Sequence, residues 1–220
     1  MNAESIDPFA LLLPLLLLGL APFAAIMVTC YAKLVVVFAL VRNGLGVQQV
    51  PPNIVLNSLA LILSAYIMAP IGQAVAEQLE RHGVMASGRM KTADFIAAIS
   101  DAREPLREFL LKHGKERERK FFVKSAGKLW PATAAERIDE RDFLIAVPAF
   151  TLSQLTSAFE VGFVIYLCFV GVDLIIANVL LALGMSMVSP TVIAVPFKLL
   201  LFIALDGWSA LIHALILSYQ

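Results

Sequence analysis

Residues 161–183, with the sequence VGFVIYLCFVGVDLIIANVLLAL, decide the fold of this 220-residue chain. They contain a single charged side chain, Asp173, and a helix needs about 20 predominantly apolar residues to cross the hydrocarbon core of a bilayer. We therefore predict a membrane helix here, at the core of an apolar run that extends from 143 to 183. The composition agrees, since 60% of the residues are hydrophobic and 15% are charged, whereas soluble domains carry about 25% charged residues.

Three further apolar runs cover residues 9–32, 54–76 and 191–219, and the first of them resumes after Lys33 and continues to Val41. Polar turns rich in glycine and proline join the four runs in two pairs. The sequence thus predicts an all-α membrane protein in which four hydrophobic helices form two kinked hairpins.

Prolines interrupt these runs and predict where the helices bend. Pro14 and Pro22 predict kinks in the first helix, and Pro70 is expected to bend or end the second. The segment before Phe9 contains two acidic residues and no basic one, whereas a secretory signal begins with a basic region. We therefore expect the first apolar run to be a retained helix and not a cleaved signal.

Residues 77–150 differ in kind, because they hold 14 of the 17 basic and 12 of the 17 acidic residues. Apolar residues recur within them at helical spacing, at Phe95, Ile96, Ile99, Leu106, Phe109 and Leu110. We expect two or three amphipathic helices outside the bilayer. The chain then divides into a first hydrophobic hairpin (1–76), a charged helical region (77–142) and a second hydrophobic hairpin (143–220).

The charges around the first loop predict the orientation of the chain. Lys33 and Arg42 lie at the approaches to this loop, whereas the N-terminal tail has acidic residues only. Because short loops flanked by Lys and Arg stay in the cytoplasm, the first loop is expected on that side. Four spans then place both termini and the charged middle region on the periplasmic side.

Motifs that carry catalysis or hold a cofactor are absent from the sequence. There is no HExxH helix, no GxSxG elbow, no P-loop and no GxGxxG turn. Cys30 and Cys168 have no CxxC partner, so we expect two buried free thiols and neither a disulfide nor a zinc site. The net charge of zero gives no argument for a nucleic-acid partner. The sequence predicts no enzyme, no cofactor and no metal.

Four charged residues lie inside or at the edge of the apolar runs, namely Glu160, Asp173, Lys198 and Asp206. A charge at the bilayer centre costs about 2.5–3.5 kcal/mol on insertion scales. Lys198 and Asp206 are about 12 Å apart along a helix axis and cannot pair simply within it. Polar contacts across helices or between subunits are the favoured explanation. The alternative is a small ion-coupled transporter that uses Asp173, Lys198 and Asp206, although no internal repeat supports it.

The turn between the third and fourth runs contains two methionines, Met185 and Met187. Methionine is flexible and polarizable and fills irregular gaps. At a hairpin tip it can serve ordinary interface packing. In a ring of subunits it can instead form an apolar constriction that closes a pore by dewetting. The spacing of the residues leaves both interpretations open.

Four sequence motifs follow one another along nearly the whole chain. Residues 42–53 read RNGLGVQQVPPN, residues 148–163 contain PAFTLSQL and AFEVGF, residues 184–190 read GMSMVSP, and residues 195–208 contain PFKLLLF and DGW. These motifs resemble the RNxLGxQQxPPN loop, the PAFxxSxL…AFxxGF signature, the methionine-rich turn and the PFKxxLF…DGW segment of one family. It is the FliP/SctR family of export-apparatus proteins of flagella and type III secretion systems.

The resemblance implies a function that composition cannot show. Members of this family form a homopentamer that joins two smaller membrane subunits, of the FliQ/SctS and FliR/SctT types, in an export gate of the bacterial inner membrane. The gate lies inside the ring of the FlhA/SctV-type protein, and secreted unfolded polypeptides pass through its axis. The chain is therefore expected to be a pore-forming core subunit of this gate.

The resemblance also assigns residues. Met185 and Met187 are expected to form a gasket around the closed pore, although Ser186 and Ser189 replace a methionine and a proline of the flagellar pattern. Assembly or intersubunit polar contacts are expected of Arg42, Gln48, Gln49, Glu160, Asp173, Lys198 and Asp206. The Met-Ser-Met turn and the lack of a recognisable signal favour the virulence-type SctR branch over the flagellar one.

Overall fold

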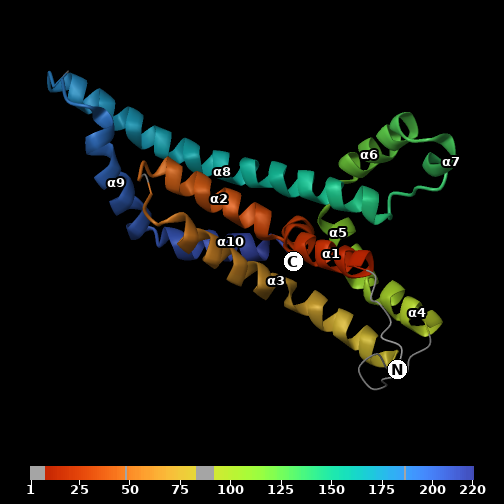
Figure 1. The fold of residues 1–220 in the computed structure, drawn as a ribbon. Coiled ribbons are helices and arrows are strands. Elements are labelled where there is room, and N and C mark those ends of the chain that lie inside the picture. Colours follow the sequence, from red (N-terminus) through yellow and green to blue (C-terminus); the bar gives the residue numbers. More distant parts are fainter. Residues whose placement is uncertain (1–7, 48, 83–91, 186) are drawn as a thin grey trace.

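The computed structural model describes residues 8–47, 49–82, 92–185 and 187–220, and all regular secondary structure in these ranges is helical. The helices are α1 (Pro8–Val28), α2 (Tyr31–Gly44), α3 (Asn53–Arg81), α4 (Thr92–Ala102), α5 (Glu104–His113), α6 (Glu116–Leu129), α7 (Ala132–Ala135), α8 (Phe143–Ala182), α9 (Pro190–Ala204) and α10 (Gly207–Leu217). Figure 1 shows an elongated molecule with the α2–α3 and α8–α9 connections toward one end and α4–α7 at the other. The predicted all-α architecture is confirmed.

Up to four segments of the described chain are long and apolar enough to cross a membrane. α3 and α8 qualify as single helices. The other two segments are bent pairs: Pro22–Val28 with α2, at an angle of 77°, and α9 with α10, at an angle of 60°. The first break lies beyond Pro22, and α3 continues through Pro70 to Arg81, so the prediction that Pro70 could end this helix is wrong.

The two single-helix segments are longer than a bilayer is thick. At 1.5 Å per residue, the 40 residues of α8 extend over about 60 Å and the 29 residues of α3 over about 44 Å, against about 30 Å of hydrocarbon. Most of the apolar surface of α8 is exposed in the single chain. Helices of this length must tilt or extend beyond the hydrocarbon, and their exposed surface must be covered by lipid or by other chains.

The core is centred on α2, which packs against both α3 and α8. Leu34, Val37, Phe38 and Val41 recur at helical spacing and are fully buried. Cys30 is buried beside them as predicted, whereas Cys168 is exposed on α8, where the prediction of a buried thiol is wrong. The face of α8 that carries Cys168 is therefore not part of the core of the single chain.

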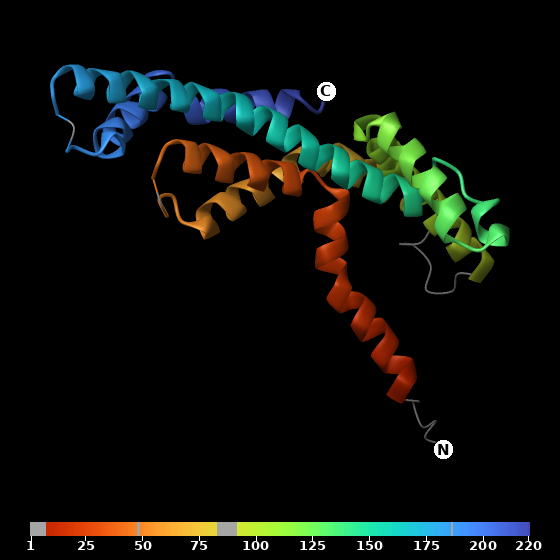
Figure 2. The ribbon, with the colours of Figure 1, turned by 90° about the horizontal axis from the view of Figure 1, so that it is seen from above.

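Helix α1 leaves the body of the molecule, as Figure 2 shows from above. It bends away from α2 and exposes large apolar side chains such as Leu15, Leu18 and Phe23. The Thr151 hydroxyl of α8 lies 2.9 Å from the Val147 carbonyl of its own helix and 3.1 Å from the Met27 carbonyl, so the end of α1 lies next to the core. An apolar helix with so few partners needs lipid or a neighbouring protein around it.

The charged middle region forms amphipathic helices, as predicted. Pro105 lies in the first turn of α5, where its missing N–H leaves no helical hydrogen bond unmade. Phe109 and Leu110 are buried, and the Phe109 ring lies 5.6 Å from that of Phe150 in α8. The side chains of the predicted Phe95 and Ile96 fall outside the described residues. Helices α5 and α6 thus cover the N-terminal half of α8.

Candidate functional site

The α8–α9 turn is the outermost tip of the second hairpin (Figure 1). Gly184 has a φ of +73°, and the Met185 amide donates to the Leu180 carbonyl at 2.9 Å, which is a common way to end a helix. Pro190 begins α9, and the Ser189 and Thr191 hydroxyls lie within hydrogen-bonding distance, 2.8 Å apart. Local residue choice thus fixes the turn on both sides.

The two methionines of this tip project away from the core. Met187 is 99% exposed and Met185 is 44% exposed, while Ser186 between them lies outside the described residues. Exposed apolar side chains that are flexible and polarizable favour contact with other chains. The described part of the tip is therefore an exposed apolar surface at the end of the second hairpin.

A buried ion pair ties the second hairpin to the first. The Lys198 ammonium of α9 donates to Asp173 Oδ2 of α8 at 2.6 Å and to the Gly44 carbonyl at the end of α2 at 3.1 Å. The Lys198 side chain is 6% exposed and that of Asp173 is 35% exposed. A cation at a helix C-terminus also compensates the negative end of the helix dipole. One lysine thus joins α2, α8 and α9.

The α2–α3 loop is held by Arg42. Its guanidinium donates to the Pro51 carbonyl at 3.2 Å and to Asn53 Oδ1 at 2.6 Å, so one side chain spans the loop from the end of α2 to the start of α3. Arg42 Nε is buried without a hydrogen-bond partner among the described residues. Arg42 was predicted to make polar contacts in assembly, and within the single chain its hydrogen bonds shape this loop.

The same loop lies against α9. Gly46 adopts a φ of +77°, and a Cβ added there would come within 2.9 Å of Val195 Cγ2. Gln49 also has a positive φ, of +71°, and its side chain is exposed. The predicted contact residue Gln48 lies outside the described residues. Glycine is required at Gly46 both for the backbone conformation and for the close approach of the two hairpins.

The remaining predicted charges lie apart from this junction. Glu160 of α8 pairs with Lys115 at 3.0 Å, and both side chains are largely exposed. Asp206 lies at the break between α9 and α10 with a φ of +51° and an exposed side chain. Of the three residues required by the transporter alternative, the structure brings together Asp173 and Lys198 and leaves Asp206 outside the pair.

A second buried polar cluster was missed by the sequence analysis. The Lys33 ammonium donates to Ser218 Oγ at 2.9 Å and lies 4.6 Å from the centre of the Tyr219 ring. The Tyr219 hydroxyl is 2.5 Å from Gln154 Oε1, and the Gln154 amide donates to the His113 carbonyl at 3.2 Å. This Lys33 cluster connects α2, the end of the chain, α8 and the middle region. The only signal for it in the sequence was a lysine between two apolar stretches.

His113 contributes its backbone carbonyl to the Lys33 cluster, and its imidazole ring lies among aromatic rings. Its ring lies 4.7 Å from that of Phe109 and 5.1 Å from that of Tyr219. Burial lowers the pKa of the His113 imidazole, and the neighbouring Lys112 and Lys33 charges lower it further. The neutral form of this histidine is therefore the one that fits the folded chain.

Side chains that could ligate a metal ion do not form a cluster in the described part of the chain. No group of three or more His, Cys, Asp or Glu side chains there is placed to hold a metal ion. The polar side chains that are buried serve instead to join helices. The site defined by the fold is thus an assembly of hairpins with an exposed methionine tip, and the molecule is a helical membrane protein with several candidate spans.

The chain belongs to the FliP family, whose sequence pattern matches residues 14–215. It is 48% identical over 217 residues to the hypersensitivity response secretion protein HrcR of Ralstonia nicotianae, covering 99% of this chain and all of that protein. It is 47% identical over 213 residues to the Yop proteins translocation protein R of Yersinia pestis, covering 97% of each. The virulence protein YscR of Salmonella typhimurium is 44% identical over 216 residues, which cover 97% of this chain and 98% of that protein.

The predicted family and its SctR branch are thereby confirmed, and the chain is a membrane component of a type III secretion export apparatus. Membership of an apparatus implies other subunits as partners. The names of the family and of these relatives describe secretion, translocation and virulence, and not catalysis.

Proposed function

We propose that this chain is a pore-forming core subunit of the export gate in the bacterial inner membrane. Five copies form a ring, together with subunits of the SctS/FliQ and SctT/FliR types and inside the ring of the SctV/FlhA-type protein. Unfolded substrates pass along the axis of the ring. Met185 and Met187 of each copy form a gasket that seals the pore when no substrate is present.

The observation that carries this proposal is the exposure of Met185 and Met187 at the tip of the second hairpin. Met187 is 99% exposed in the single chain, which is unfavourable for an apolar side chain unless another molecule covers it. Copies of the tip around one axis would cover each other and expel water from a narrow apolar passage. Because methionine has three rotatable bonds, such a ring can deform around different extended polypeptides.

The unpartnered apolar surface supports assembly with other chains. Helices α1, α3, α8 and α9 all expose large hydrophobic side chains. The length of α8, about 60 Å, exceeds what one perpendicular crossing would bury in lipid. Helices that cover each other in a ring would account for this surface, and would also accept polar residues such as Glu160 and Asp206 more readily than lipid does.

The junction at Lys198 supports a defined position of the tip. Because Lys198 binds both Asp173 and the end of α2, the second hairpin cannot swing freely against the first. A gasket requires the same placement of its methionines in every copy. We infer that the junction provides this placement, so that the Asp173–Lys198 pair acts in assembly through the position of the tip.

Ion leak through the assembled gate tests the gasket. Replacement of both Met185 and Met187 by alanine removes the apolar volume and should raise the conductance of the gate in planar bilayers, while native mass spectrometry still finds five copies. Replacement of both by leucine should keep the conductance low, because the apolar volume is retained. Met27→Ala is the matched control, since Met27 is 52% exposed and lies far from the tip in the sequence. Unchanged conductance in the double alanine variant would contradict the gasket.

A further inference from the structure

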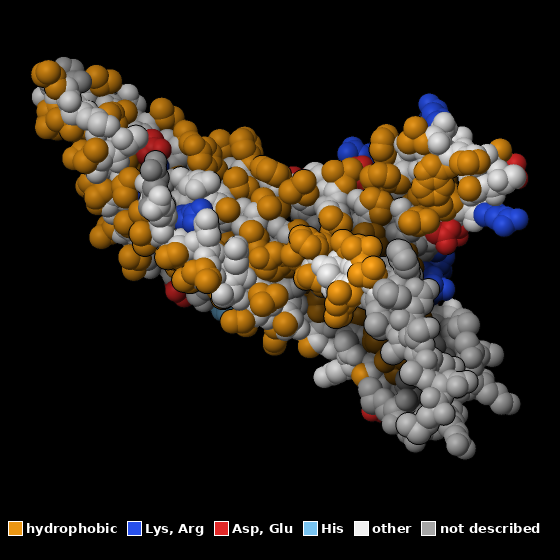
Figure 3. All heavy atoms as spheres, viewed as in Figure 1, with side chains coloured by type: hydrophobic (Ala, Val, Ile, Leu, Met, Phe, Trp, Pro, Cys, Tyr) orange, Lys and Arg blue, Asp and Glu red, His pale blue; other side chains and the backbone are white. Residues whose placement is uncertain are grey.

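Helix α6 carries a basic face in the charged middle region. This face is formed by Arg117, Lys120, Phe121, Lys124 and Lys128, all of which are exposed. Their spacing of three, four, seven and eleven residues from Arg117 places them on one side of a helix. Phe121, which is 58% exposed, lies in the middle of the four cations. Figure 3 shows Lys and Arg atoms protruding among hydrophobic atoms at this end of the molecule.

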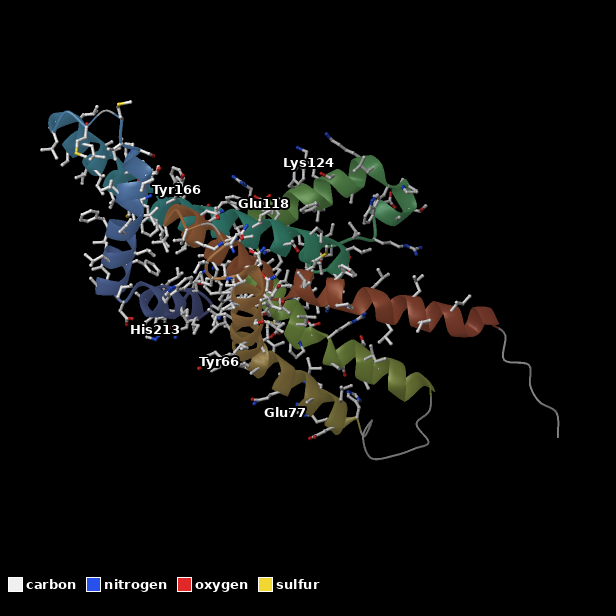
Figure 4. The ribbon with its side chains drawn as sticks, turned by 60° about the vertical axis from the view of Figure 1, so that its left-hand side comes forward. Tyr66, Glu77, Glu118, Lys124, Tyr166 and His213 are labelled. Atoms are coloured by element: carbon white, nitrogen blue, oxygen red, sulfur yellow. The ribbon has the colours of Figure 1, made fainter. Side chains whose placement is uncertain are left out.

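The opposite side of α6 is occupied by the chain itself. Glu118 and Ala126 are buried against the rest of the molecule. Figure 4 shows Lys124 projecting from α6 on the side away from α8. The start of α6 is tied to α8 by the Lys115–Glu160 ion pair (3.0 Å), one residue before the apolar stretch 161–183 begins. The basic face thus begins next to Glu160, within the candidate membrane helix α8.

The charge of this face is only partly compensated. Helix α6 contains five basic and two acidic residues, a surplus of three positive charges. Arg117 pairs with Glu118, and Lys120 pairs with Glu116, but exposed pairs of this kind are weak and are readily exchanged for other anions. No ion pair of Lys124 or Lys128 is found among the described residues. The face can therefore take up several negative charges.

We propose that the basic face of α6 binds the surface of a bilayer that contains anionic phospholipids. Lysine and arginine bind phosphate head groups while their aliphatic stems lie along apolar surface, and Phe121 between them can enter the boundary between head groups and acyl chains. An acidic protein surface would use the four cations but would gain less from an exposed aromatic ring at their centre. Combined basic and aromatic side chains beside a membrane segment are typical of a lipid interface.

A tryptophan at the centre of the face reports this contact. In the full chain with Trp130→Phe and Trp208→Phe, Phe121→Trp gives a single tryptophan, and the protein is placed in nanodiscs with brominated phosphatidylglycerol or brominated phosphatidylcholine. Brominated phosphatidylglycerol should quench the fluorescence more strongly. In the variant with Lys120→Gln, Lys124→Gln and Lys128→Gln, the affinity of the face for the anionic lipid should fall about fivefold for each lysine, so that the preferential quenching is lost. The preferential quenching should also fall at high salt.

Two controls make the result specific. Ile99→Trp in the same background places the reporter on α4, where Ile99 is 46% exposed outside the basic face, and should show no preference for the anionic lipid. Replacement of Arg81, Arg103 and Lys112 by glutamine removes the same charge elsewhere and should leave the quenching at position 121 unchanged. Equal quenching by both lipids, or no quenching by either, would overturn the proposal. A blue shift at position 121 that appears only when the other gate subunits are present would assign the face to a protein partner.

Discussion

The Lys198 ammonium lies 2.6 Å from Oδ2 of Asp173, across the boundary between α9 and α8 and 25 residues away in the sequence. The two partners differ in burial, because the Lys198 side chain is 6% exposed and that of Asp173 is 35% exposed. Loss of the carboxylate leaves a buried cation, and loss of the cation leaves a carboxylate whose Oδ1 is buried without a hydrogen-bond partner among the described residues. Removal of either partner alone should therefore be costly.

We expect Asp173→Ala to lower the free energy of unfolding by about 3 kcal/mol, the range found when one partner of a buried pair is removed. Lys198→Met keeps the aliphatic stem but leaves the Asp173 carboxylate unpaired with a buried Oδ1, and should also cost about 3 kcal/mol. The double variant should recover part of the loss in Asp173→Ala, since no unpaired buried charge remains. Unfolding in mixed detergent micelles measures these differences. Asp206→Asn is the control and should change little, because Asp206 is exposed and Asn tolerates its backbone conformation.

The close contact of α2 with α8 depends on Gly162. A Cβ at this position would come within 3.0 Å of Leu40 Cβ and closer still to the end of that side chain. Gly162→Ala should therefore destabilise the chain by about 1–3 kcal/mol. Gly171 lies in the same helix with no atom within 4 Å of an added Cβ, and Gly171→Ala should be neutral or slightly stabilising, because alanine favours helices. Equal effects of the two substitutions in a thermal unfolding assay would refute this packing.

His113 should make stability depend on pH. Its pKa in the folded chain is lowered by burial and by Lys112 and Lys33, so below about pH 6.5 the unfolded chain binds a proton that the folded chain does not. The free energy of unfolding should therefore fall as the pH drops below about 6.5. Above that pH, His113 should make no contribution to the pH dependence. His113→Gln should flatten the dependence. His213→Gln should not, since His213 is exposed on α10; a flat profile in the parent chain would contradict the burial of His113.

The sequence was sufficient to predict the hairpins, because apolar runs without charges have few alternatives to membrane helices. The extent of α8 was also predicted, since the apolar run 143–183 matches Phe143–Ala182. The end of α3 was not, because charged residues after 76 continue this helix to Arg81, beyond the predicted run 54–76. Proline did not predict where the helices end, since α3 continues through Pro70 while α1 and α2 are separated by a break at residues 29–30, which contain no proline. Hydrogen bonding and packing around a proline decide whether the helix continues.

The polar junctions could be predicted only in part. That Lys198 does not pair with Asp206 followed from helix geometry, but the choice of Asp173 depends on how α8 and α9 cross. Lys33 was interpreted as a charge that flanks a loop, whereas it is buried against Ser218 and Tyr219 from the other end of the chain. Contacts between residues so distant in sequence depend on tertiary packing, which has no local signature. The methionine tip was visible in the sequence because it is a local turn.

The passage of a substrate past the methionine turn is the central claim, and photo-crosslinking tests it most directly. A photoreactive phenylalanine analogue at Met187 in the complete apparatus is illuminated while a fusion substrate is stalled during secretion. We predict crosslinks between position 187 and the stalled substrate, and none from position 203 at the end of α9 that is remote from the methionine turn, where Ile203 is 75% exposed. Crosslinks from position 203 but not from position 187, in an apparatus that still secretes, would contradict a pore lined by the methionine turn.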